Sequence, residues 1–144
     1  KTIENAQTLG EELHDLGVDI LGEKLGFTKS HTIIGDVRKY GGGRRVAERL
    51  ERCGIILNKN LIPVDHNKNS MDPSGIRMGA QEITRIGFEK DDVKRVAKLI
   101  YRAISKDIPD EEIRKDVMDL KGRFNEVKFC YGKKAPYDYI TLFK

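Results

Sequence analysis

One arginine lies inside a short apolar segment of the sequence, where a charged side chain is unusual. The segment 74–79 (SGIRMG) places Arg77 between Ile76 and Met78 and brackets it with glycines. A guanidinium in such a place needs a partner, and its planar fork binds a carboxylate through two parallel hydrogen bonds. The glycines permit close approach of a ligand or another backbone. Arg77 is therefore a candidate carboxylate-binding residue, and a structural salt bridge within the same domain is the alternative.

A second segment has residue types that bind phosphate. Three glycines, 41–43, precede Arg44 and Arg45 at the start of a helical pattern. Backbone N–H groups at a helix start, next to arginines, can bind an anion. The segment lacks the Gly-Lys-Ser/Thr ending of a P-loop, and glycine runs commonly form turns. We therefore interpret it first as a turn with solvated basic residues.

The histidines and cysteines do not have the spacing of a metal site. His14, His31 and His66 lie far apart in the sequence, and no His-Glu-x-x-His motif occurs. The two cysteines, Cys53 and Cys130, are too few and too distant for a disulfide framework, so we expect reduced thiols. Cys53 lies on an apolar helical face and is expected in the core. The sequence predicts no metal ligands.

Apolar periodicity predicts the elements that position these side chains. Helical spacing occurs in residues 3–16, 46–53, 93–104 and 113–124, and Pro109 with three acidic residues starts the last of these helices. Short β-branched or apolar segments predict strands at 18–21, 31–37, 55–57 and 76–78, and residues 80–85 suit one or two helical turns. The strands are too close in sequence for βαβ crossovers. We therefore predict an α+β fold, with a small, mainly antiparallel sheet covered by helices.

Residues 58–75 form a long connection rich in Asn, Asp, Pro and Ser. They show little apolar periodicity, so the sequence predicts irregular structure there. Long connections of this kind are usually either functional or disordered.

Composition and charge narrow the class of protein. The chain has 144 residues and 16.4 kDa, with 38% hydrophobic and 35% charged residues, which suits one domain with a densely ionic surface. Its net charge of +4 comes from 27 basic and 23 acidic residues that are interleaved, which argues against a dedicated nucleic-acid binder. No segment is apolar enough for a membrane span or a signal peptide. We expect a soluble, cytoplasmic protein with the ionic composition of heat-adapted proteins.

Three segments, taken together, resemble a known family. They are 54–63 (GIILNKNLIP), 73–80 (PSGIRMGA) and 83–88 (ITRIGF), and their order and spacing are similar to those of the C-terminal part of serine hydroxymethyltransferase. Residues 30–37, the helix before Cys53 and the two closing helices also resemble that family's small domain. The resemblance implies that residues 1–129 are the C-terminal small domain of a fold-type I pyridoxal-phosphate enzyme. Residues 1–16 of this domain are expected to connect to a large domain, and residues 130–144, which follow it, form a Tyr-rich tail.

The resemblance also implies an activity and two site residues. The family transfers a hydroxymethyl group between serine and a reduced pterin with pyridoxal phosphate as cofactor, and it forms glycine. Arg77 falls on the family's arginine that holds the substrate carboxylate. Asn60 falls on an asparagine that contacts the pterin, and an amide offers both a donor and an acceptor for this. A structural role of Asn60 in fixing the connection is the alternative.

The resemblance places most of the catalytic machinery outside this chain. Nothing here resembles the Thr-rich, His-Lys segment that holds the Schiff-base lysine, nor the family's other cofactor contacts. We therefore expect no catalytic or cofactor-binding residue here, and a fragment that is inactive alone. The absence of an initiator Met and the start within a helical pattern agree with a fragment. In the parent, a homodimer, the large domain would bind the cofactor.

Departures from the common family pattern concern the one-carbon carrier. Residues 80–82 read Ala-Gln-Glu where bacterial members commonly have Thr-Pro-Ala, and the 58–75 connection is unusually rich in Asn and Asp. These features resemble archaeal members. The resemblance therefore implies either tetrahydrofolate or tetrahydromethanopterin as the reduced pterin.

Two other functions stay open at this point. One is a non-enzymatic basic α+β module that binds anions or RNA through Arg44, Arg45 and the Tyr-rich tail. The other is a different pyridoxal-phosphate transferase with the same domain plan. Segments 58–60 and 83–85 disfavour the latter.

Overall fold

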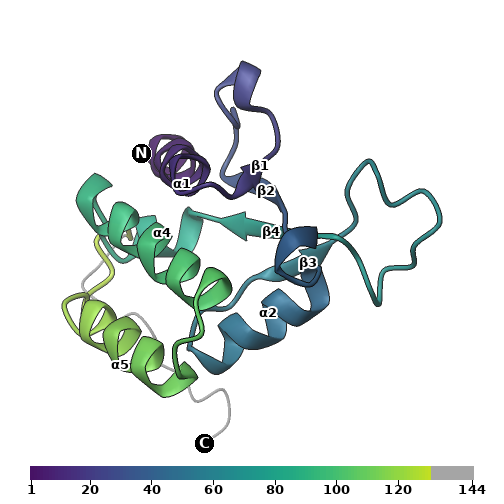
Figure 1. Ribbon diagram of the computed structural model, residues 1–144. Helices are drawn as coiled ribbons and strands as arrows, with labels where there is room; N and C mark the ends of the chain where they lie inside the picture. Colours follow the sequence, from purple (N-terminus) through teal and green to yellow (C-terminus); the bar gives the residue numbers. More distant parts are fainter. Residues whose placement is uncertain (131–144) are drawn as a thin grey trace, which may run out of the picture.

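The computed structural model describes residues 1–130 as helices packed on one side of a small sheet (Figure 1). The helices are α1 (Thr2–Asp15), α2 (Gly43–Arg52), α3 (Gln81–Arg85), α4 (Lys90–Ser105) and α5 (Asp110–Lys121). The strands are β1 (Asp19–Ile20), β2 (Thr32–Asp36), β3 (Asn58–Asn60) and β4 (Gly75–Gly79), and short 3-10 turns lie at Glu23–Leu25 and Arg38–Tyr40. None of the helices in this part of the chain is long and apolar enough to cross a membrane.

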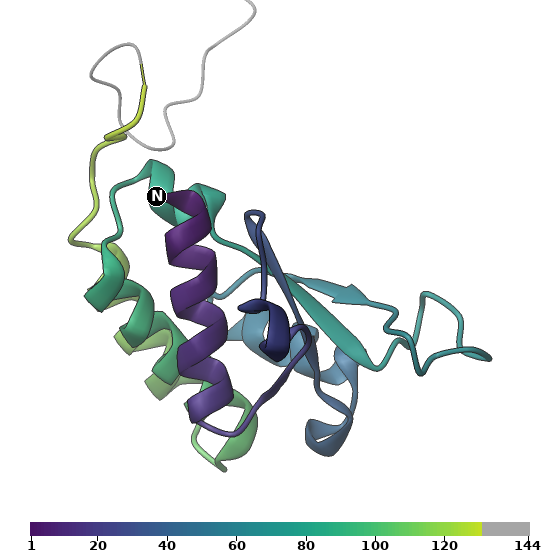
Figure 2. The ribbon, with the colours of Figure 1, turned by 90° about the horizontal axis from the view of Figure 1, so that it is seen from above.

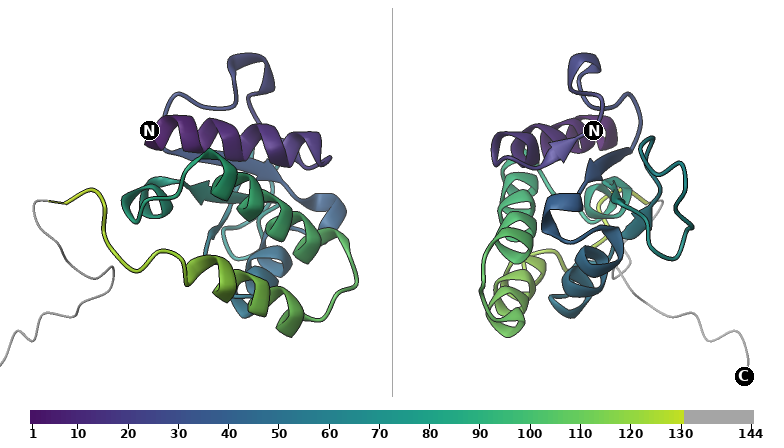
Figure 3. Two further views of the ribbon diagram at one scale, coloured as in Figure 1. Left: turned by 90° about the vertical axis from the view of Figure 1, so that its left-hand side faces the viewer. Right: turned by 45° about the vertical axis from the view of Figure 1, so that its right-hand side comes forward.

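The strands form one antiparallel sheet in the order β1-β2-β4-β3. Ile33 of β2 and Ile76 of β4 point to the helices and are at most 1% exposed. Helices α1 and α2 contact the sheet, α4 packs against both of them, and α5 packs against α4 and α2. The left panel of Figure 3 shows α1, α4 and α5 side by side as one layer. Because strand residues alternate between faces, the opposite face of the sheet carries a different set of side chains.

Local sequence explains the helix boundaries. In α1, the residues Ala6, Leu9 and Leu13 recur at helical spacing and are buried, and Gly17 ends the helix with a φ of +91°. Helix α4 begins with a capping box, in which the side chains of Glu89 and Asp92 each accept a hydrogen bond from the other residue's backbone N–H. The predicted helices and the α+β architecture are therefore confirmed.

Two predicted boundaries are wrong for physical reasons. Residues 55–57 are not a strand: Ile55 and Leu57 pack against the core, whereas Ile56 is 86% exposed. The strand is instead the polar segment Asn58–Asn60, within the connection predicted to be irregular, because pairing with β4 outweighs its weak strand propensity. The last helix ends at Lys121 instead of continuing to Phe124, whose ring stacks on that of Phe88 at 4.0 Å.

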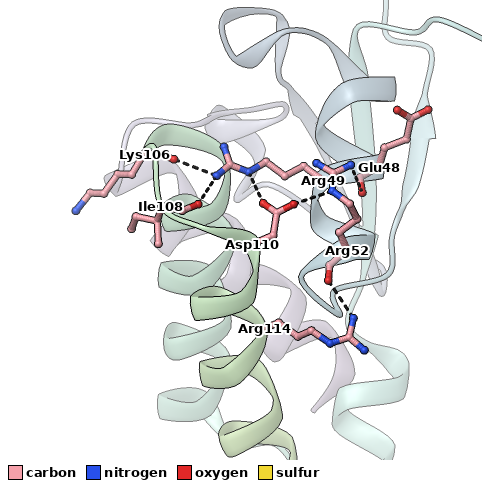
Figure 4. Close-up of polar contacts among 7 residues, drawn as sticks. All are labelled: Glu48, Arg49, Arg52, Lys106, Ile108, Asp110 and Arg114. Atoms are coloured by element: carbon pink, nitrogen blue, oxygen red, sulfur yellow. Dashed lines mark hydrogen bonds and ion pairs between the residues drawn. The ribbon is translucent and has the colours of Figure 1, made fainter.

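A cluster of arginines around Asp110 joins α2 to the start of α5 and to the connection that precedes it (Figure 4). Arg49 and Arg52 each donate from Nε to the Asp110 carboxylate, at 3.2 and 2.7 Å. Arg49 also donates to the carbonyl oxygens of Ile108 and Lys106, at 2.8 and 3.3 Å. One guanidinium therefore satisfies carbonyls just beyond α4, which lack helical donors of their own.

This cluster predicts an acid-dependent contribution to stability. The hydrogen bond from Arg52 most strongly lowers the pKa of Asp110, partial burial opposes it, and Arg49 lowers the pKa further. A carboxyl whose folded pKa lies below its unfolded pKa stabilises the fold above about pH 4, and the contribution is lost as the pH falls through the folded pKa. We expect Asp110→Asn to lower the unfolding free energy by about 1 kcal/mol at neutral pH, with the difference from wild type shrinking below about pH 4.

The measurement is urea unfolding of the full-length protein at several pH values. Asp107→Asn is the matched control, because Asp107 is exposed in the same connection and forms no ion pair within residues 1–130. An Asp110→Asn difference that is the same at pH 3 and pH 7 would contradict a role for the ionised carboxylate.

Candidate functional site

The sheet register gathers the two predicted site residues on one face. Asn58 pairs with Arg77, and Asn60 pairs with Gly75. Arg77 also lies opposite Ile34 of β2. Because Ile76 and Met78 face the helices, these partners lie on the other face, which we call the open face and define by Thr32, Ile34, Asn58, Asn60 and Arg77. The open face therefore brings Arg77 and Asn60 together.

The guanidinium of Arg77 is exposed and lacks an acidic partner. It donates from Nη2 to the Asn58 side-chain oxygen at 3.3 Å, and it forms no ion pair with any other residue of 1–130. The salt bridge considered from the sequence is thus not found within the described residues. The apolar neighbours do not enclose Arg77, because strand alternation turns them to the opposite face. Its positive charge remains available to a ligand.

Asn60 is half-buried at the end of β3. Its side-chain NH₂ group donates to the carbonyl oxygen of Leu61 at 2.6 Å, at the start of the 61–74 connection. The amide oxygen accepts no hydrogen bond from the described residues. Asn60 therefore has the structural contact considered above, and it keeps an acceptor for a ligand.

Asp65 closes the base of the 61–74 connection. Its buried carboxylate accepts backbone N–H bonds from Ile62 at 3.0 Å and from Ser74 at 2.9 Å, so that residues on both sides of the connection are joined. Burial raises the pKa of Asp65, but the donors of Ser74 and Ile62 outweigh it, and the net pKa is lowered. Figure 2 shows the connection extending from the sheet on the side away from α1, α4 and α5. Asp65 therefore holds the ends of β3 and β4, which carry Asn60 and Arg77.

The glycines of this region allow α2 to approach the same base closely. The N–H of Gly43 donates to the Pro73 carbonyl oxygen at 2.8 Å. A Cβ atom at Gly43 would overlap the Gly75 carbonyl oxygen and lie 3.0 Å from that of Pro73. Gly41 and Gly42 have φ values of +100° and +88°, as expected for a turn. Arg44 pairs with Glu48 at 2.9 Å and is not an unpaired anion ligand.

The Asp36 carboxylate lies on the open face, but it is already bound by an arginine other than Arg77. Asp36 of β2 pairs with Gly75 and so shares the face of Arg77. Arg38 donates to both of its oxygens, with Nε at 2.9 and 3.0 Å and Nη2 at 2.7 Å. Burial raises the pKa of Asp36, and the Arg38 contacts lower it by more. Asp36 is therefore held by Arg38 instead of neutralising Arg77.

The remaining chemical candidates do not join this face. Cys53 is fully buried in the core, as predicted, and burial raises the pKa of its thiol. His66 is exposed in the 61–74 connection. No group of three or more metal-ligating side chains occurs among the described residues.

Sequence reasoning missed Asn58, Asp65 and the Arg38–Asp36 pair. Asn58 and Asp65 become identifiable only when β3 is known to pair with β4, which nothing in their local sequence indicates. The Asp36–Arg38 spacing is a local signal, since an aspartate can bond the backbone two residues ahead. Here it accepts the Arg38 N–H at 3.1 Å.

Comparison with known proteins agrees with this arrangement. Residues 1–100 match the family model for serine hydroxymethyltransferase. The chain is similar to serine hydroxymethyltransferases of Picrophilus torridus (56% identity over 99% of this chain and 33% of the relative) and Thermoplasma acidophilum (56%, 97% and 33%). That of Archaeoglobus fulgidus is 45% identical over 99% of this chain and 32% of the relative. The chain thus spans about a third of the length of these relatives.

A solved structure extends the comparison to the fold. L-threonine transaldolase from Pseudomonas fluorescens matches with a TM-score of 0.72 and 28% identity, over 85% of this chain and 27% of that chain. The predicted fold class, an α+β domain with a small antiparallel sheet of a fold-type I pyridoxal-phosphate enzyme, is confirmed. The family model covers residues 1–100 of 144, and two of these relatives are identical to the chain at more than half of its residues. The chain therefore belongs to the serine hydroxymethyltransferase family.

Proposed function

We propose that residues 1–129 are the C-terminal small domain of a pyridoxal-phosphate-dependent serine hydroxymethyltransferase. In this proposal residues 1–16 connect to the large domain, and residues 130–144 form a tail, of which 131–144 lie outside the described residues. The parent protein is a cytoplasmic homodimer that interconverts serine and glycine. The observation that carries the proposal is an exposed Arg77 without an acidic partner, on the face that also holds Asn60, in a chain of this family.

Arg77 would bind the substrate carboxylate. Serine and glycine share that carboxylate and an amine, and the guanidinium fork can bind the carboxylate with two parallel hydrogen bonds. One donor of Arg77 is used by Asn58, and a guanidinium has five. Arg77 would therefore orient serine, which carries the hydroxymethyl group, and glycine, which does not, in the same way.

The cofactor would be held by residues outside this chain. Pyridoxal phosphate, when bound, supplies an electron sink for cleavage of the bond between Cα and Cβ. The strand positions of the open face carry no lysine within the described residues. Lys59 belongs to the opposite face of β3, and its ammonium group donates to the Met71 carbonyl oxygen at 3.0 Å. We therefore propose that this chain orients substrates and is inactive alone.

Asn60 would contact the reduced pterin, either tetrahydrofolate or tetrahydromethanopterin. Its free amide oxygen can accept from a ring N–H group of either carrier. We expect Asn60→Ala in the full-length protein to weaken pterin binding about threefold to tenfold and to leave glycine binding unchanged. Asn67→Ala, an exposed amide of the same connection, is the matched control.

The test is an absorbance titration of the full-length protein loaded with pyridoxal phosphate. Glycine should shift the cofactor spectrum, and a reduced pterin added afterwards should strengthen the change. The pterin that acts at the lower concentration identifies the carrier. A protein without cofactor absorbance, or one that does not respond to glycine, would refute the transferase proposal.

Two rival functions are addressed by the same samples. Serine and threonine compared as substrates distinguish a hydroxymethyltransferase from a threonine transaldolase such as the structural neighbour. Salt-sensitive binding of single-stranded RNA would favour the basic module. The ion pair between Arg44 and Glu48, together with the family membership, disfavours that module.

A further inference from the structure

Arg77 lies opposite an uncharged residue where an acid would stabilise the sheet more. Asn58 is its direct partner across β3 and β4, and both side chains are exposed. Oppositely charged cross-strand pairs stabilise antiparallel sheets. An aspartate at position 58 would have the same shape as the asparagine and would add an ion pair. With a neutral asparagine at position 58, the sheet lacks the stabilisation that an ion pair with Arg77 would provide.

The other carboxylates near this end of the sheet are also kept from Arg77. Asp36 shares its face but is held by Arg38 through both oxygens. Asp65 accepts two backbone N–H groups and is buried. The acceptor that contacts Arg77 is thus the amide of Asn58, whereas the two nearby carboxylates have other donors. The arrangement leaves the charge of Arg77 unneutralised by the described residues.

We propose that Asn58 is a positioning residue for the substrate carboxylate. Its amide oxygen accepts one N–H of Arg77 and so restricts the orientation of the guanidinium, without cancelling the charge that attracts the carboxylate. The proposal rests on the proposed function, in which Arg77 binds that carboxylate. It adds that the enzyme's selectivity for an anionic amino acid depends on an uncharged residue at position 58.

The decisive variant is Asn58→Asp in the full-length protein with pyridoxal phosphate bound. The substitution keeps the side-chain shape at an exposed position, so the fold should be retained, and the thermal midpoint checks this. The new carboxylate would compete with the substrate for Arg77. We expect the dissociation constant of glycine to rise about fivefold or more. Asn67→Asp makes the same charge change at an exposed site of the neighbouring connection and should have no effect.

The specific readout is discrimination between glycine and glycinamide, which lacks the negative charge. Wild type should bind glycine much more tightly than glycinamide, and Asn58→Asp should reduce that ratio by weakening glycine alone. A merely structural defect would weaken both ligands equally. Asn58→Ala removes the orienting acceptor without adding charge, so it should weaken glycine about twofold to threefold and keep most of the discrimination.

The outcomes separate this inference from the proposed function. If wild type does not respond to glycine, the proposed function fails first. If wild type binds glycine and Arg77→Ala abolishes the binding, the function stands. In that case an Asn58→Asp protein with an unchanged glycine constant, or with equal losses for glycine and glycinamide, overturns the role of Asn58.

Discussion

Replacing Arg77 with alanine in the full-length protein is expected to lower kcat/KM for serine by about 30-fold to several thousand-fold. The range corresponds to the roughly 2 to 5 kcal/mol lost when one partner of a buried, hydrogen-bonded charge pair is removed, and it applies to Arg77 if the proposed large domain covers the open face. Most of the loss should appear in KM, because the guanidinium binds a part of the substrate that does not react. Steady-state kinetics with serine and a saturating reduced pterin measure it.

Two further variants sharpen this result. Arg77→Lys keeps the charge but loses the planar fork, so it should recover only part of the activity. Arg95→Ala removes an exposed arginine on α4, in the helical layer, and should leave the kinetics at the wild-type level. Unchanged serine kinetics in Arg77→Ala would show that another group holds the carboxylate.

Gly43→Ala is expected to have the largest effect on stability, about 2 to 3 kcal/mol. The added methyl group would overlap the Gly75 carbonyl oxygen, and that oxygen belongs to a paired strand that cannot move without disturbing the ladder. Separating α2 from β4 to make room would also break the hydrogen bond from Gly43 to Pro73. Thermal unfolding of the full-length protein should therefore occur at a lower temperature.

Gly122→Ala is the matched control for this prediction. Gly122 follows α5 with a φ of −59°, a conformation open to any residue, and a Cβ atom there would lie 3.3 Å from the Met118 carbonyl oxygen. Its thermal midpoint should stay close to that of wild type. If Gly43→Ala unfolds at the same temperature as Gly122→Ala, the base of the 61–74 connection is not as tightly packed as the structure indicates.

Local sequence indicated the strand that carries Arg77 because the signal for that strand is local. A charged residue inside an apolar segment bracketed by glycines is visible without knowledge of the fold, and β4 forms where that segment stands. The helices were predicted for the same reason, since 3.6-residue periodicity is contained within each of them. The pattern alone did not decide between a ligand contact and a salt bridge for Arg77. The family resemblance implied that Arg77 and Asn60 both contact substrates.

The polar strand β3 could not be predicted in this way. Asn58 and Asn60 have weak strand propensity, and their pairing partners in β4 lie beyond the whole 61–74 connection. The roles of Asn58 and Asp65 depend on that pairing, so they could not be predicted from the local sequence either. Likewise, Phe124 has the spacing of a helical residue, but it lies beyond the end of α5, and its ring stacks on that of Phe88.

The order of strands in the sheet has a consequence for folding. The central pair joins β2 to β4, which are separated in sequence by all of α2, β3 and the 61–74 connection. Closing such a loop costs chain entropy before any contact is gained, so pairings of this kind form slowly compared with helices. The helices can begin to form locally, whereas the face that carries Arg77 exists only after distant segments have met. The open face is therefore expected to be among the last parts of this chain to form during folding.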